Sequence, residues 1–164
     1  MKRQQWLANW GLSNLKLSAP FLEAEFEPQD YDRDAAWELY IELLTRVATQ
    51  PLPTDHGDEA AALKSLYKLF PVTREILRRN GKYTGEFAKI AIPVLNQVLR
   101  PVTAKWHPIS LSDGFKDEAR RTEFRADLRR IRPTLVQFSR ALADLAGVED
   151  LTELEEPANR TTGN

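Results

Sequence analysis

The stretch that decides the fold is Phe87-Ala88-Lys89-Ile90-Ala91-Ile92-Pro93-Val94-Leu95-Asn96-Gln97-Val98-Leu99. Its apolar residues leave almost no gap, since only Pro93, Asn96 and Gln97 interrupt the run between residues 90 and 99. A helix that is apolar on nearly every side is typical of the buried centre of a protein. We therefore expect a central helix that starts near residues 84–86, with other helices packed around it.

Three further segments repeat apolar side chains at helical spacing, and they cover residues 30–50, 58–80 and 115–146. Each pattern predicts a helix with one buried face and one solvated face. Between the central helix and the last segment, residues 107–114 are predicted to form a loop that begins at His107-Pro108. Four long amphipathic segments joined by short connections favour a helix bundle.

Prolines inside these segments make a regular coiled coil an unsuitable description. A proline within a helix removes one backbone hydrogen bond and clashes with the preceding turn, so Pro71, Pro93 and Pro133 are each expected to kink or split their helix. The fold class predicted from the sequence is therefore all-α. It is an irregular four- to five-helix bundle with proline kinks and an extended N-terminal arm.

The N-terminal 28 residues follow a different pattern. Trp6 and Trp10 are four apart, which would place both on one face of a short helix. Apolar and acidic residues then alternate over residues 22–27. We expect residues 1–28 to form an arm that packs on the core, and a strand at an edge or donated to a partner stays open as an alternative. The bundle itself then spans residues 29–147, and residues 148–164 form an acidic, partly disordered tail.

Composition excludes several classes of function. The 164 residues contain no cysteine, which rules out disulfides, thiolate zinc sites and cysteine nucleophiles. The formal net charge is −1, so no global field attracts nucleic acid or a membrane. Glycine-rich phosphate loops, seryl nucleophile motifs, a signal peptide and an apolar run of about 20 residues are all missing. We expect a cytoplasmic protein with no membrane association, no cofactor and no metal site.

The clearest candidate for catalysis is a pair of residues that follows the central stretch. Arg100 and His107 are seven apart and would share one face of a continuous helix. This spacing resembles the Arg-to-His motif of HEPN domains, which are small helical bundles that include dimeric, metal-independent ribonucleases. The resemblance implies that His107 would move a proton and that Arg100 would stabilise the transition state. Pro101 stands where those nucleases usually carry a polar residue.

A second resemblance covers residues 87–108, together with Leu69-Phe70 and residues 73–77. These segments look like parts of uncharacterised small bacterial helical proteins, some of which lie beside effector or conflict-system modules. The resemblance implies a role in bacterial antiviral defence or signalling, and it brings no catalytic residues with it.

Arginines cluster in the last helical segment, between Arg120 and Arg132. Arg121, Arg125 and Arg129 step by four and would line one face. Such a stripe could follow a phosphate backbone, which keeps nucleic-acid binding open as an alternative. Acidic residues interleave with the stripe, however, and a solvated, ion-paired face explains it as well.

The leading hypothesis is a non-catalytic helical interaction module, an adaptor, regulator or small subunit that binds a protein partner or itself. It rests on the absence of a strong catalytic signature and on apolar side chains near the chain start that exceed the apparent needs of the core. Trp106 is expected to anchor against a neighbouring helix. The candidate binding residues are Trp6, Trp10, Phe21, Phe26, Trp106, Arg121, Arg125 and Arg129.

Overall fold

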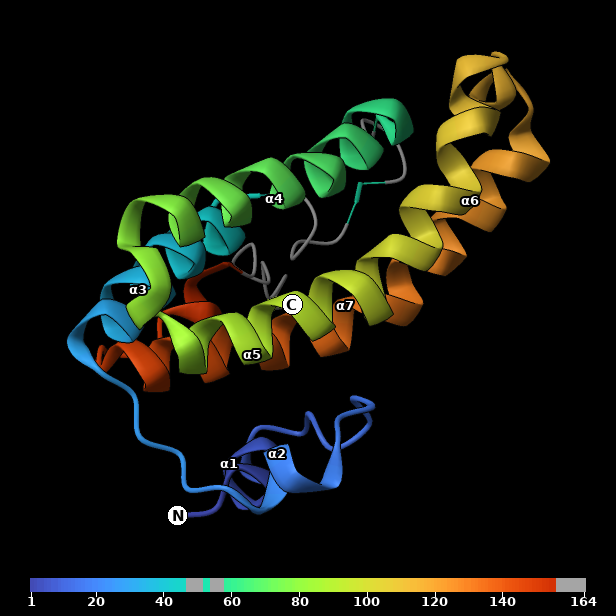
Figure 1. The fold of residues 1–164 in the computed structure, drawn as a ribbon. Coiled ribbons are helices and arrows are strands. Elements are labelled where there is room, and N and C mark those ends of the chain that lie inside the picture. Colours follow the sequence, from blue (N-terminus) through green and yellow to red (C-terminus); the bar gives the residue numbers. More distant parts are fainter. Residues whose placement is uncertain (47–51, 54–57, 156–164) are drawn as a thin grey trace, which may run out of the picture.

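The computed structural model describes residues 1–46, 52–53 and 58–155. The predicted all-α fold is confirmed. Its centre is a continuous helical rod made of α5 (Gly85–Val94), a π-helical turn η2 (Leu95–Leu99) and α6 (Arg100–Leu111). Figure 1 shows these segments running end to end as one long diagonal helix.

The first half of the rod is the buried centre that its apolar sequence predicts. Phe87, Ile90, Ala91 and Val94 have no exposed surface. The helix begins where the Phe87 backbone N–H donates to the buried carboxylate of Asp32, at 2.9 Å. This contact ties the start of α5 to the start of a neighbouring helix, so the register between the two is fixed by a polar group as well as by packing.

Prolines flank the π-helical turn. Because Pro93 and Pro101 lack an N–H, the carbonyl groups four residues before each of them have no donor in a regular α-helical ladder. Within the turn, the Arg100 N–H donates to the Leu95 carbonyl, five residues back. The extra residue in this turn rotates the side chains that follow it, and π-helical turns of this kind are frequent at functional sites.

Three helices surround the rod: α3 (Asp30–Leu44), α4 (Glu59–Asn80) and α7 (Glu118–Ala146). In Figure 1 α7 runs alongside the rod, and α4 lies across from it. Helix α3 packs mainly on α7 and α4 through its small and apolar face. That face consists of Ala35, Ala36, Leu39, Tyr40 and Leu43.

The structure corrects the predicted loop at residues 107–114. Helix α6 continues to Leu111 with Pro108 inside it, and only the short turn η3 (Gly114–Lys116) separates it from α7. Pro108 and Ala104 are both exposed, so solvent can bond the Ala104 carbonyl that the proline leaves without a donor. Pro71 and Pro133 likewise lie inside uninterrupted helices, so neither splits its helix.

The N-terminal arm contains two short helices, α1 (Arg3–Asn9) and α2 (Ala19–Glu23), followed by extended residues. The predicted extended arm is therefore helical in part, and Pro20 in the first turn of α2 favours that start. In the described part of the chain no strand forms, and the only β contact is an isolated bridge between Lys2 and Glu25.

A buried ion pair holds the arm on the rod. The Arg3 guanidinium donates from Nε and Nη2 to the two carboxylate oxygens of Glu86, at 2.6 and 2.5 Å. Its other donors reach the carbonyls of Phe21 and Glu25. Arg3 is only 4% exposed. The arm is thus closed on itself and on α5 by one fully engaged side chain.

The chain after α7 folds back onto α3. The Leu151 N–H donates to the Tyr40 hydroxyl at 2.6 Å, and Thr152 is buried beside Arg140. The disorder that we expect at the end of the acidic tail concerns residues 156–164, which lie outside the described residues. The loop that follows the predicted helix of residues 30–50 also lies largely outside the described residues.

Candidate functional site

A groove lies between α4 and the rod, and its cavity measures about 450 Å³. We call it the α4–α6 groove. Both apolar and polar side chains line it. Its apolar wall consists of Tyr67, Phe70 and Leu77 from α4 and of Ile92 and Leu95 from the rod.

Exposed apolar side chains lie on both walls of this groove. Ile92 on α5 is 45% exposed, although Ala91 before it is buried, and Tyr67 on α4 is 38% exposed. The groove therefore leaves apolar surface in water on both of its walls, and such surface often marks a site where another molecule binds.

The polar wall of the groove carries positive charge from Arg74 and Arg100. The Arg100 guanidinium lies over the Phe70 ring, 4.7 Å from its centroid, and Nε donates to the Asn96 side-chain oxygen at 3.1 Å. Arg74 donates from Nε to the Phe70 carbonyl at 3.4 Å. Among the described residues no carboxylate lies within ion-pair distance of either arginine.

Thr73 contributes a buried hydroxyl group to the same wall. The residue is 2% exposed, and its Oγ1 has no hydrogen-bond partner among the described residues. A buried hydroxyl without a partner costs the folded state about 1–3 kcal/mol. This unmet polar atom distinguishes Thr73 from the other threonine of the groove, Thr103, which donates to the carbonyls of Leu99 and Arg100.

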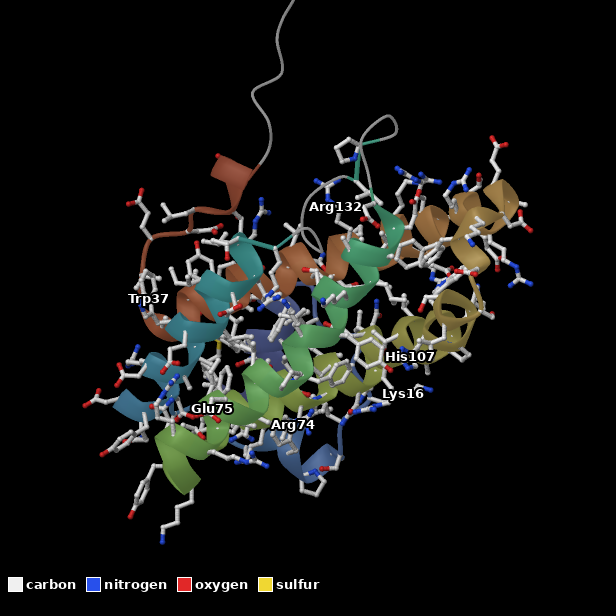
Figure 2. The ribbon with its side chains drawn as sticks, turned by 90° about the horizontal axis from the view of Figure 1, so that it is seen from above. Lys16, Trp37, Arg74, Glu75, His107 and Arg132 are labelled. Atoms are coloured by element: carbon white, nitrogen blue, oxygen red, sulfur yellow. The ribbon has the colours of Figure 1, made fainter. Side chains whose placement is uncertain are left out.

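The structure brings the Arg100–His107 pair to one side of α6. Pro101 directly follows the π-helical turn, and the helix continues through it to His107. His107 packs its ring against Tyr67, with centroids 5.0 Å apart, while Arg100 covers Phe70. Both residues thus contact α4. Figure 2 labels His107 on α6 and Arg74 on α4. Seven residues of helix separate them by about 10.5 Å along the axis.

The aromatic residues predicted to bind a partner have internal contacts in this structure. Trp6 is 3% exposed and stacks on Phe26, and Trp106 is fully buried. The indole N–H groups of Trp6 and Trp10 both donate to Asp144, at 2.6 and 3.2 Å. Phe21 lies under the Arg3 guanidinium, 4.3 Å from its ring centroid. The four aromatic residues of the arm therefore serve its docking, and Trp106 packs inside the bundle against Phe115 and Phe124.

Two arginines of the predicted stripe on α7 also have contacts within the protein, and the third is exposed. Arg121 donates to the carbonyls of Phe115 and Lys116 at the turn before α7. Arg125 donates to Glu59 at 2.8 Å and to two carbonyls at residues 52–53. Arg129 is exposed. Two members of the stripe therefore serve connections within the fold.

A second polar cluster joins α6 to α7. The buried Asp127 carboxylate accepts hydrogen bonds from the Trp106 indole and from Lys105, both at 2.8 Å, and Arg130 pairs with it at 3.0 Å. Burial works to raise the pKa of Asp127, but these donors and positive charges outweigh it and hold the pKa below its usual value. The hydrogen bond that Lys105 donates to Asp127 also raises the pKa of Lys105. The cluster braces the two helices and lies outside the α4–α6 groove.

Of the groove residues, sequence reasoning identified Arg100 as a candidate for chemistry and missed Phe70, Thr73, Arg74 and Ile92. The sequence did contain a signal for Ile92. A helix that has one solvated side and carries an unbroken apolar run must expose at least one apolar residue of that run. The signal for the three α4 residues was absent, since their position opposite Arg100 follows from the packing of helices distant in sequence.

No group of His, Asp or Glu side chains in the described ranges is arranged to hold a metal ion. Likewise, none of the helices in those ranges combines the length and the apolar character that crossing a membrane requires. Comparisons of the chain with protein-family models, with curated proteins and with solved structures give no match.

Proposed function

We propose that this protein is a non-catalytic interaction module that holds a segment of a partner protein in the α4–α6 groove. The observation that carries the proposal is the apolar surface left in water on both walls, at Tyr67 on α4 and at Ile92 on α5. A surface groove between two helices can bury one face of an amphipathic helix and leave its other face solvated.

The proposal places recognition in a different part of the chain from the one that the sequence favours. Trp6 and Phe26 stack on each other within the docked arm, so the faces in contact are not free for a partner. The groove, by contrast, is open to solvent in this structure. The resemblance of residues 87–108 to small bacterial helical proteins near defence modules supports a bacterial assembly as the source of the partner.

Co-purification from the native host tests this function with a matched pair of variants. Ile92→Glu places a charge on the groove wall, whereas Ile41→Glu places the same charge on α3, where the isoleucine is 38% exposed and outside the groove. We expect the same partner to co-purify with the wild type and with Ile41→Glu, and to be lost with Ile92→Glu. Retention of that partner by folded Ile92→Glu would show that the groove is not the recognition site.

A second candidate function is RNA cleavage by Arg100 and His107. It is favoured by one specific observation, the placement of both residues on the α4 side of an unbroken α6. Side chains on a helix lean toward its N-terminus, so His107 leans toward Arg100. Cleavage of RNA by the wild type and its loss in His107→Ala would support this candidate, and equal activity of the two proteins, or activity in neither, would remove it.

A further inference from the structure

We infer that the α4–α6 groove selects an anionic ligand: the segment that it binds presents a carboxylate to Arg74 and Arg100 beside an apolar side chain. This inference rests on the proposed function, because it names the chemistry of the partner for the same groove. It is carried by the position of these two arginines, which line a partly apolar groove with no carboxylate of the described residues within ion-pair distance.

Three other arginines that reach between elements are paired with acidic residues of the chain. Arg3 pairs with Glu86, Arg125 pairs with Glu59 at 2.8 Å, and Arg79 pairs with Glu38. These pairs join elements that are distant in sequence, so the charges have a structural use. Arg33 and Arg121 also reach other elements, and their donors are taken up by backbone carbonyls.

Arg74 and Arg100 face a neighbouring helix without such a carboxylate. Their contacts with described residues are to neutral oxygens, the Phe70 carbonyl and the Asn96 amide. Each of those contacts uses Nε, which leaves the terminal nitrogens of both guanidinium groups for a ligand. A guanidinium group presents these donors in a planar fork that matches a carboxylate.

Arg100 is also held in place before any ligand binds. Its guanidinium is stacked on Phe70 and bonded to Asn96, which lies one turn back in the π-helical turn. A side chain that is already ordered loses less conformational entropy on binding than a free one. This arrangement is typical of a recognition residue rather than of a solvated surface arginine.

The rest of the groove sets the shape of the ligand. Phe70, Leu77 and Leu95 form an apolar wall beside the two positive charges, and the Thr73 hydroxyl adds one polar atom without a partner. A purely hydrophilic anion would leave the apolar wall uncovered, and a purely apolar ligand would desolvate the arginines without pairing them. An acidic amphipathic helix satisfies both parts of the groove.

Two dyes that share one ring system test the anion preference directly. The probes are 8-anilinonaphthalene-1-sulfonate and N-phenyl-1-naphthylamine, which lacks the sulfonate group, and their fluorescence is titrated against the full chain. We expect the sulfonate to bind more tightly than the neutral dye, and its affinity to fall with added salt. Arg100→Gln and Arg74→Gln should each weaken the sulfonate about tenfold, the equivalent of one charge-assisted hydrogen bond.

The neutral dye supplies the control for folding, because its affinity should change less than about twofold in these variants. Lys82→Gln, which removes an exposed positive charge outside the groove, should leave both dyes unchanged. Equal affinity for the two dyes, binding of neither, or a loss of both dyes in Arg100→Gln would overturn the inference. Those results would not decide the proposed function, because the Ile92→Glu co-purification tests it separately. Failure of that co-purification would overturn the proposed function itself.

Discussion

Two arginines of this protein show how the same side chain serves opposite purposes. Arg3 is 4% exposed, and every one of its contacts is made within the chain, to Glu86 and to two carbonyls. Arg100 is exposed, is ordered by an aromatic ring and an amide, and has terminal nitrogens to spare. The first is a structural residue, and the second has the geometry of a recognition residue.

This difference predicts opposite effects on stability. Glu86→Gln leaves the buried Arg3 charge without its carboxylate, so we expect the free energy of unfolding to fall by about 3–5 kcal/mol. Arg100→Gln removes a surface charge with no ion pair and should change it by less than about 0.5 kcal/mol. Urea unfolding followed by circular dichroism measures both. Similar losses in the two variants would mean that Arg100 is also structural.

Thr73 allows a test of an unmet hydrogen bond. Thr73→Val keeps the shape of the side chain and removes the hydroxyl that has no described partner. We expect the free energy of unfolding to rise by about 1 kcal/mol, because the folded state no longer buries an unsatisfied polar atom. Thr103→Val, at a hydroxyl that is bonded to the Leu99 carbonyl, should lower it instead. A loss of stability in Thr73→Val would show that its hydroxyl is bonded in solution.

Asp127 makes stability depend on pH in the acid range. Its pKa in the folded state lies below the ordinary value of 3.8, so the unfolded chain takes up the proton first as the pH falls. The contribution of Asp127 is therefore complete well above pH 3.8 and is lost as the pH decreases through the lower folded-state pKa. Urea unfolding at a series of pH values should show a shallower acid decline in Asp127→Asn than in the wild type. Parallel curves would contradict this assignment.

At the scale of the elements, the sequence predicts which segments are helical and fails where prolines are read as breaks. The apolar run of residues 87–99 correctly predicts the buried centre. The loop predicted from His107-Pro108 is wrong, because the lost hydrogen bond of Pro108 falls on a solvated side of α6. The π-helical turn could not be predicted, since two prolines eight residues apart are compatible with a kink, a break or a wider turn.

The docking of the arm depends on a turn that needs glycine. Gly11 has φ +69°, and a Cβ there would lie 2.5 Å from the Gln137 side-chain nitrogen. Gly11→Ala should therefore destabilise the protein by about 1–2 kcal/mol, mainly through the positive φ, since the end of Gln137 can move aside. Gly85→Ala, in open space at the start of α5, should be neutral or slightly stabilising.

Thermal unfolding and limited proteolysis of the arm measure the two glycine variants together. We expect faster cleavage between α1 and α2 only in Gly11→Ala. Equal destabilisation by Gly85→Ala would contradict the assignment of the effect to the positive φ of Gly11.

At the scale of the whole molecule, the candidate site is a product of packing that no single segment contains. Arg100 could be singled out from the sequence because it follows the most apolar helix. Its partners across the groove could not, because Phe70 and Arg74 lie on a helix whose position against α6 depends on the entire bundle. The surplus of aromatic residues near the chain start was misleading for the same reason: Trp6 and Trp10 meet Asp144, which is more than 130 residues away in sequence.

The account stands on the claim that the α4–α6 groove is where this protein binds its ligand. Methyl NMR of isoleucine-labelled protein tests it most directly, because Ile92 lies on the groove wall and Ile41 on α3 outside it. During a titration with 8-anilinonaphthalene-1-sulfonate we predict that the Ile92 methyl resonance shifts and saturates with the same Kd as the fluorescence, while that of Ile41 stays in place. A saturating shift at Ile41 with none at Ile92 would contradict the central claim.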